Sequence, residues 1–111
     1  MSRPVLVVED YADLRSAIVD ALERHDYTCA SVASAEEAVV WLREHDCGAI
    51  LLSARLPITE DPVIRYLASN HPEEMDKVIV MADPSTACAP CELLEKPFTN
   101  DQLFARLSLR D

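Results

Sequence analysis

The stretch VLVVED at residues 5–10 is the part of the chain that decides the fold. Its first four residues are β-branched or leucine, and the acidic pair Glu9 and Asp10 follows them directly. A short apolar run without polar alternation is typical of a strand that is buried on both faces, as in a parallel sheet. Residues 12–25 then change to a helical period, with apolar side chains every three or four positions. The stretch and its surroundings therefore predict a strand followed by a covering helix.

Strand and helix patterns alternate along the rest of the chain. Further strands are predicted at 29–32, 48–53, 78–81 and around 93–94. Further helices are predicted after Ser34, over 63–70 and after Thr99. This alternation predicts an α/β fold in one domain over residues 1–111, with a doubly wound, five-stranded parallel sheet in the flavodoxin-like order 2-1-3-4-5.

Residues 83–91 leave little room for a helix between the fourth and fifth strands. They number nine and include Pro84 and Pro90, whereas an average helix takes about 11 residues before its loops are added. We therefore expect this helix to be missing or much shortened.

Composition excludes several classes of function. The 111 residues carry 10 basic and 20 acidic side chains and a formal net charge of −10, so nucleic acid is not an expected partner. Gly48 is the one glycine, which excludes a glycine-rich phosphate cradle. No apolar run reaches the roughly 18 residues of a membrane span. Glu9 and Asp10 follow the N-terminus too closely to leave room for the apolar region of a signal peptide. We expect a soluble, cytoplasmic protein.

Each of the three histidines stands where a predicted helix ends: His25, His45 and His71. The carbonyl end of a helix favours a positive charge. We expect these side chains to serve as helix caps rather than as metal ligands.

Three stretches together resemble a known family. VLVVED at 5–10, LLSARLP at 51–57 and EKPF at 95–98 are similar, in order and spacing, to the receiver domain of two-component response regulators. The resemblance covers essentially the whole chain. It implies a site at the carboxyl ends of the strands, which is also where doubly wound folds bind their ligands.

The resemblance implies roles for particular residues, and the chain departs from the family at the central one. Glu9 and Asp10 match the acidic pair that helps to bind Mg²⁺. Counting back four residues from the loop proline, Pro57, places Ser53 where the family has its phosphoacceptor aspartate.

Two further positions also depart from the family. Ala82 stands where receivers have a threonine or serine, and Leu93 stands where they have an aromatic switch residue. Lys96 keeps the family's lysine. The resemblance therefore implies a degenerate phosphorylation site without the residues that normally report phosphorylation.

These losses have direct chemical consequences. An aspartate attacks phosphorus as a carboxylate, whereas Ser53 needs a base, and the Asp10 carboxylate is a poor one. Without a third carboxylate, Glu9 and Asp10 should hold Mg²⁺ only weakly, and Lys96 can neutralise Asp10 instead. We expect no catalytic residue, no enzymatic activity and no cofactor beyond weakly bound Mg²⁺.

Cys88 and Cys91 form a possible redox pair. Their CAPC spacing resembles that of thioredoxin, but the motif precedes a predicted strand and so lacks the helix N-terminus that lowers a thiol pKa. A structural zinc site would need two more ligands, and Cys29 and Cys47 lie on the far side of the predicted sheet. Ordinary thiols are favoured, with a reversible disulfide as the main alternative.

The sequence thus predicts a pseudo-receiver that acts as a phosphorylation-independent protein-interaction module in two-component signalling. The expected partner is a histidine kinase, a phosphotransferase or another regulator, and a homodimer is also compatible. Neither nucleic acid nor a membrane is expected. The alternatives are a thiol redox switch through Cys88 and Cys91 and, with less support, an unorthodox phosphoacceptor at Ser53.

Overall fold

The computed structural model describes residues 3–53, 60–82, 92–95 and 99–108. Its elements are, in chain order, β1 (Val5–Val8), α1 (Ala12–Arg24), β2 (Cys29–Val32), α2 (Ala35–Glu44), β3 (Ala49–Ser53), α3 (Pro62–Asn70), the 3₁₀ helix η2 (Pro72–Lys77), β4 (Val78–Ala82), β5 (Glu92–Glu95) and α4 (Asn100–Ser108). All strand pairings are parallel, in the order β2-β1-β3-β4-β5. The predicted α/β class and strand order are confirmed. The prediction of a missing or shortened helix between β4 and β5 falls on residues 83–91, outside the described residues.

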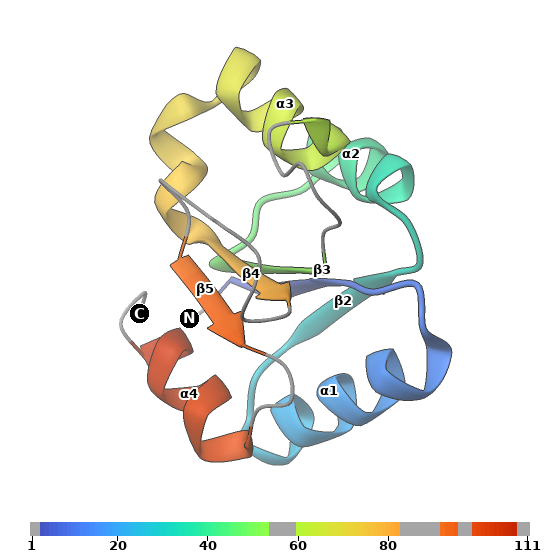
Figure 1. Cartoon of the computed structure of the whole chain (residues 1–111), viewed down its shortest axis with the longest axis vertical. Helices are drawn as coiled ribbons and strands as arrows, with labels where there is room; N and C mark the ends of the chain where they lie inside the picture. The colour runs from blue at the N-terminus through green and yellow to red at the C-terminus, as the bar shows by residue number, and fades with distance from the viewer. Residues whose placement is uncertain (1–2, 54–59, 83–91, 96–98, 109–111) are drawn as a thin grey trace.

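Helices cover the sheet on both faces (Figure 1). Helices α2 and α3 lie on one face, and α1 and α4 lie on the other. Among the described residues, no helix combines the length and the apolar character needed to cross a membrane.

The strands supply both halves of the core, because successive side chains of a strand point to opposite faces. In β1, Leu6 and Val8 pack toward α2 and α3, whereas Val5 and Val7 pack toward α1 and α4. All four are almost completely buried. The continuous apolar run at the start of the chain is therefore a strand buried on both faces, as predicted.

The end of α1 shows how a chain with a single glycine makes a tight turn. Asp26 has a φ of 66°, the left-handed conformation that glycine usually adopts after a helix. The amide of Asp26 donates to the carbonyl of Glu23 at 3.1 Å, and the amide of Tyr27 donates to that of Leu22 at 3.0 Å. The first bond satisfies the carbonyl of Glu23, and the second adds to the bond that the carbonyl of Leu22 accepts from the amide of His25 at 3.0 Å.

Hydroxyl side chains begin two of the helices. Ser34 precedes α2 and accepts a hydrogen bond from the amide of Glu37 at 3.1 Å. The Glu37 carboxylate reaches back one residue further than in the usual capping box and accepts from the amide of Ala33 at 3.0 Å. At α4, Thr99 and Gln102 exchange a reciprocal pair of bonds.

Candidate functional site

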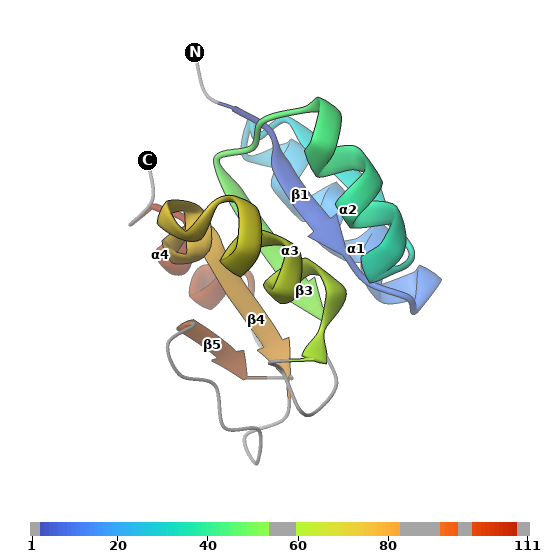
Figure 2. The same ribbon diagram turned by 90° about the horizontal axis from the view of Figure 1, so that it is seen from above.

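The strand register brings the predicted site residues to one edge of the sheet. All labelled strands in Figure 2 point the same way, so their carboxyl ends meet at that edge. Val8 is level with Leu52, so Glu9 and Asp10 emerge beside Ser53, the last residue of β3. Ser53 pairs with Met81, and Ala82 pairs with Glu95, the residue before position 96.

Glu9 is a structural part of this edge. Its side chain is the one buried charged group among the described residues, with only 2% of its surface exposed. Its Oε2 atom accepts a hydrogen bond from the amide of Tyr11, the residue that precedes α1, at 3.1 Å. Its carbonyl accepts from Nη1 of Arg15 at 2.7 Å. These bonds join the end of β1 to the first turns of α1. One carboxylate oxygen of Glu9 is thereby engaged in a hydrogen bond with the backbone.

A hollow of about 400 Å³ opens next to Glu9 at the same edge. Asp10 and Ser53 both line it, which places the retained acid and the hydroxyl in one site. Three more carboxylates line it as well: Glu36, Glu60 and Asp61. The described part of its lining is therefore acidic and favours cationic groups over phosphate-bearing anions.

Asp61 has a carboxyl group whose pKa is shifted by its position in the hollow. Its half-buried carboxylate begins α3 and accepts from the amide of Val63 at 2.8 Å. Burial raises the pKa of Asp61, and the nearby Glu36 carboxylate adds to the rise, while the amides of Val63 and Ile64 oppose it. Loss of solvent is therefore the main cause of the shift, and the charge of Glu36 is a smaller one.

Several residues of the sequence-based site are not placed by the structure. The backbone positions of Ala82 in β4 and Leu93 in β5 are given, but their side chains are not described. Lys96 and the pair Cys88 and Cys91 lie outside the described residues. Among the predicted site residues, the structure therefore brings together Glu9, Asp10 and Ser53.

The sequence analysis did not assign the acidic lining from α2 and α3, which consists of Glu36, Glu60 and Asp61, to the site. A usable signal was present. In a doubly wound fold each helix starts just after the carboxyl end of a strand. Acidic residues at the start of α2 and α3 are thereby brought to the same edge as Asp10 and Ser53.

The other two cysteines have little reactivity to offer. Burial raises the pKa of Cys29 to about 11, with help from the Glu23 carboxylate. Burial also raises the pKa of Cys47 to about 11, and the thiol side chain is almost inaccessible. Both are free thiols.

Comparison of the fold with solved structures gives a consistent result. The receiver domain of sensor histidine kinase PA1611 from Pseudomonas aeruginosa PAO1, solved with a magnesium ion in its active-site cleft, has a TM-score of 0.83 and 22% identity, with 99% of this chain and 98% of that chain covered. The receiver domain of a putative Luxo repressor protein from Vibrio parahaemolyticus has a TM-score of 0.83 and 24% identity, covering 99% and 90%. The fold is that of a receiver domain.

A third similar structure extends the likeness to the full length of both chains. Chemotaxis protein CheY4 from Vibrio cholerae has a TM-score of 0.79 and 16% identity, and each chain is covered completely. By sequence, no family model matches the chain, and neither does any curated protein. The receiver fold is thus kept while sequence identity with these structures is low.

Proposed function

We propose that this protein is a pseudo-receiver: a receiver-like module of two-component signalling that binds a protein partner without being phosphorylated. Ser53 carries the proposal. It ends β3, lines the hollow with Asp10 and occupies the position that the resemblance assigns to the phosphoacceptor aspartate. A serine hydroxyl is a poor nucleophile at neutral pH without a strong base, and the carboxylates around the hollow are weak bases.

Magnesium fits the described residues weakly. Mg²⁺ prefers several oxygen ligands in near-octahedral geometry. Glu9 is buried, and one of its carboxylate oxygens accepts a hydrogen bond from the amide of Tyr11. Ser53 offers a neutral hydroxyl in place of a carboxylate. Asp10 remains as an exposed acid beside them. Bound Mg²⁺ would offset the negative charge of the hollow, and Asp10 is the described residue best placed to hold it.

Phosphorylation by a small donor tests the proposal directly. The protein is incubated with acetyl phosphate and Mg²⁺, and its intact mass is measured. We expect no mass increase of about 80 Da, the mass of one phosphoryl group. A stoichiometric adduct that is lost in Ser53→Ala would show an unorthodox phosphoacceptor and overturn the proposal. Ser53→Asp restores a carboxylate nucleophile and serves as the variant in which labelling becomes chemically feasible.

The partner is sought on the surface of α1. Asp13 and Asp20 are exposed there and are suited to a basic surface on a histidine kinase, phosphotransferase or regulator. Affinity capture followed by mass spectrometry compares the wild type with the variant Asp13→Lys and Asp20→Lys. A partner of the expected classes should be lost with this double reversal and kept with Glu44→Lys, a control on an exposed residue of α2, which packs on the opposite face of the sheet from α1. Recovery of the same proteins by both variants would contradict binding through α1.

A further inference from the structure

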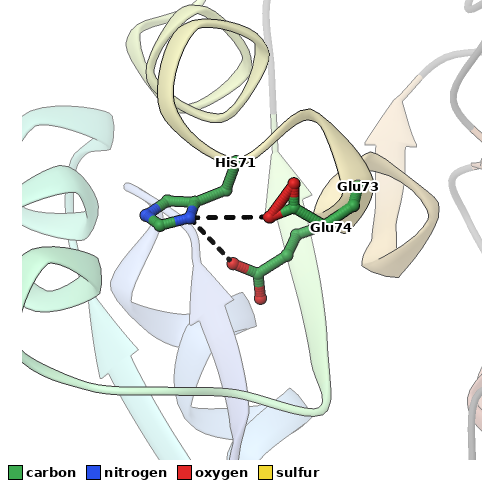
Figure 3. A group of neighbouring side chains, drawn as sticks. All are labelled: His71, Glu73 and Glu74. Carbon is green, nitrogen blue, oxygen red and sulfur yellow. Dashed lines mark ion pairs between the residues drawn. The ribbon is translucent and has the colours of Figure 1, made fainter.

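A group of potential metal ligands lies at the opposite end of the sheet from the acidic hollow. His71 follows the last residue of α3, and Glu73 and Glu74 lie in the first turn of η2, which leads into the start of β4. Figure 3 shows the two carboxylates turned toward one edge of the imidazole ring. The sequence analysis expected His71 to cap a helix rather than to bind a metal, and the proposed function gives these three residues no role.

The donor atoms are close together. Nδ1 of His71 lies 3.7 Å from Oε1 of Glu73 and 3.7 Å from Oε2 of Glu74. One donor atom from each of the three side chains lies within 4.8 Å of the other two. A nitrogen and two carboxylate oxygens facing one point make a donor set suited to a divalent transition-metal ion.

The backbone makes this arrangement compact. The amide of His71 donates to the carbonyl of Leu67 at 2.7 Å, and the amide of Glu74 donates to the carbonyl of His71 at 2.9 Å. Pro72 lies between them at the first position of η2, with its φ angle fixed by the ring. All three donors therefore come from one short turn that is ordered before any ion binds.

Lys77 fixes the orientation of the Glu74 carboxylate. Its ammonium lies 2.6 Å from Oε1 of Glu74 and donates to the carbonyl of Cys47 at 3.2 Å. The other carboxylate oxygen, Oε2, is the one that faces His71. Lys77 thus acts as a positioning residue for Glu74 and leaves the oxygen nearest the imidazole to an incoming ion.

An ion can reach the group from solvent. A hollow of about 330 Å³ is lined by His71 and Glu74 and also by His45 and Asp46. The side chain of His71 is 45% exposed and that of Glu73 is 70% exposed. Water can therefore complete the coordination of an ion held by the three side chains.

We propose that His71, Glu73 and Glu74 form a binding site for a divalent transition-metal ion, for which Zn²⁺ is the probe. Two ligands bound to Zn²⁺ at about 2.0–2.1 Å can lie no more than about 4.2 Å apart. Both distances from Nδ1 already meet this limit. The exposed Glu73 side chain can rotate to bring its oxygen closer to that of Glu74. The imidazole nitrogen discriminates against Mg²⁺, which prefers oxygen ligands.

The test is calorimetric titration with ZnCl₂ in a Cys88→Ser and Cys91→Ser background, which removes a competing thiol pair. In this background His71→Gln and Glu73→Gln should each weaken Zn²⁺ binding by at least about tenfold, as loss of a metal-site residue commonly does. His45→Gln is the matched control, since His45 lines the same hollow but is not one of the three donors. It should leave the affinity unchanged, and urea unfolding checks that each variant is folded.

Two further readouts separate this site from any other. Zn²⁺ should shift the NMR signals of the His71 ring and leave those of His25 in place, and a hundredfold excess of Mg²⁺ should not reverse the shift. The proposal is overturned if the background protein binds no Zn²⁺, if folded His71→Gln binds it as tightly as the background protein, or if His45→Gln weakens binding as much as His71→Gln. None of these results depends on whether Ser53 is phosphorylated.

Discussion

Cys47 shows how position in the fold sets the chemistry of one side chain. It lies just before β3 with 1% of its surface exposed, and burial raises its pKa to about 11. Cys29 reaches a similar pKa in β2. Since thiolates are the reactive form of cysteine, neither residue is suited to redox exchange.

Alkylation by iodoacetamide at neutral pH measures this directly. Each unit of raised pKa lowers the thiolate population about tenfold, so native Cys29 and Cys47 should react about a hundredfold more slowly than in urea. Peptide mass spectrometry reports each site separately. Equal rates for native and unfolded Cys47 would contradict the burial described here.

Asp61 is a residue whose charge and hydrogen bonding oppose each other. Because its pKa is raised in the folded protein, the folded state holds the proton more tightly than the unfolded state does. This contribution to stability is present at low pH and is lost as the pH rises through the raised pKa. At neutral pH the charge on the carboxylate therefore lowers the free energy of unfolding. The hydrogen bond that it accepts from the amide of Val63 still stabilises the start of α3.

Two substitutions separate these effects. Asp61→Asn keeps a good helix cap without the charge and should be at least as stable as the wild type at pH 7. Its advantage should shrink as the pH falls through the raised pKa of Asp61. Asp61→Ala loses the cap and should cost about 1 kcal/mol relative to Asp61→Asn. Urea unfolding at several pH values provides the comparison, and an advantage of Asp61→Asn that grows toward acid would contradict the assigned sign.

At the scale of the element, α2 depends on its first turn. Ser34 and Glu37 satisfy two backbone amides there, and Ala38 is the buried residue that follows them. Ser34→Ala should lower the free energy of unfolding by about 1 kcal/mol. Ser16→Ala, at an exposed position within α1, is the control and should be neutral or slightly stabilising. Urea midpoints that move equally in the two variants would show that the cap contributes nothing.

The elements differ in how well the sequence predicts them. Strands β1, β3 and β4 are continuous apolar runs, and their patterns carry the prediction without further information. The 3₁₀ helix η2 was not predicted, because a proline followed by acidic residues gives no apolar periodicity.

The acidic hollow was missed for a different reason: it exists only where the starts of α2 and α3 meet the ends of β1 and β3. Glu9 was predicted as a weak metal ligand, and only the structure shows it buried and bonded to the start of α1.

At the scale of the whole molecule, part of the negative charge lies at the carboxyl edge of the sheet. The net charge is −10, and four carboxylates line one hollow with Ser53. Ser53 is neutral, so it avoids the repulsion that an aspartate at this position would add to these carboxylates. We therefore expect the fold to depend less on a stabilising cation there than it would with an aspartate at position 53.

Ser53→Asp tests this balance. We expect the added carboxylate to lower the free energy of unfolding by about 1 kcal/mol without a divalent ion. Mg²⁺ should restore the stability, because an ion that binds only the folded state stabilises it. Thermal unfolding with and without Mg²⁺ should show a larger increase in Tm for Ser53→Asp than for wild type or for Ser53→Asn, the neutral isostere. Equal responses of Ser53→Asp and Ser53→Asn would contradict this account.

The sheet also divides the core into two sets of contacts, and among the described residues these sets share no buried side chain. Ile64 of α3 belongs to one set and Ile18 of α1 to the other. Each change to valine should cost about 0.5–1.5 kcal/mol. In a double-mutant cycle the two costs should add to within about 0.5 kcal/mol, and a larger coupling would show that strain passes through the strands. Additive costs would show that the sheet separates the two halves of the core energetically, so that either half could change in sequence independently of the other.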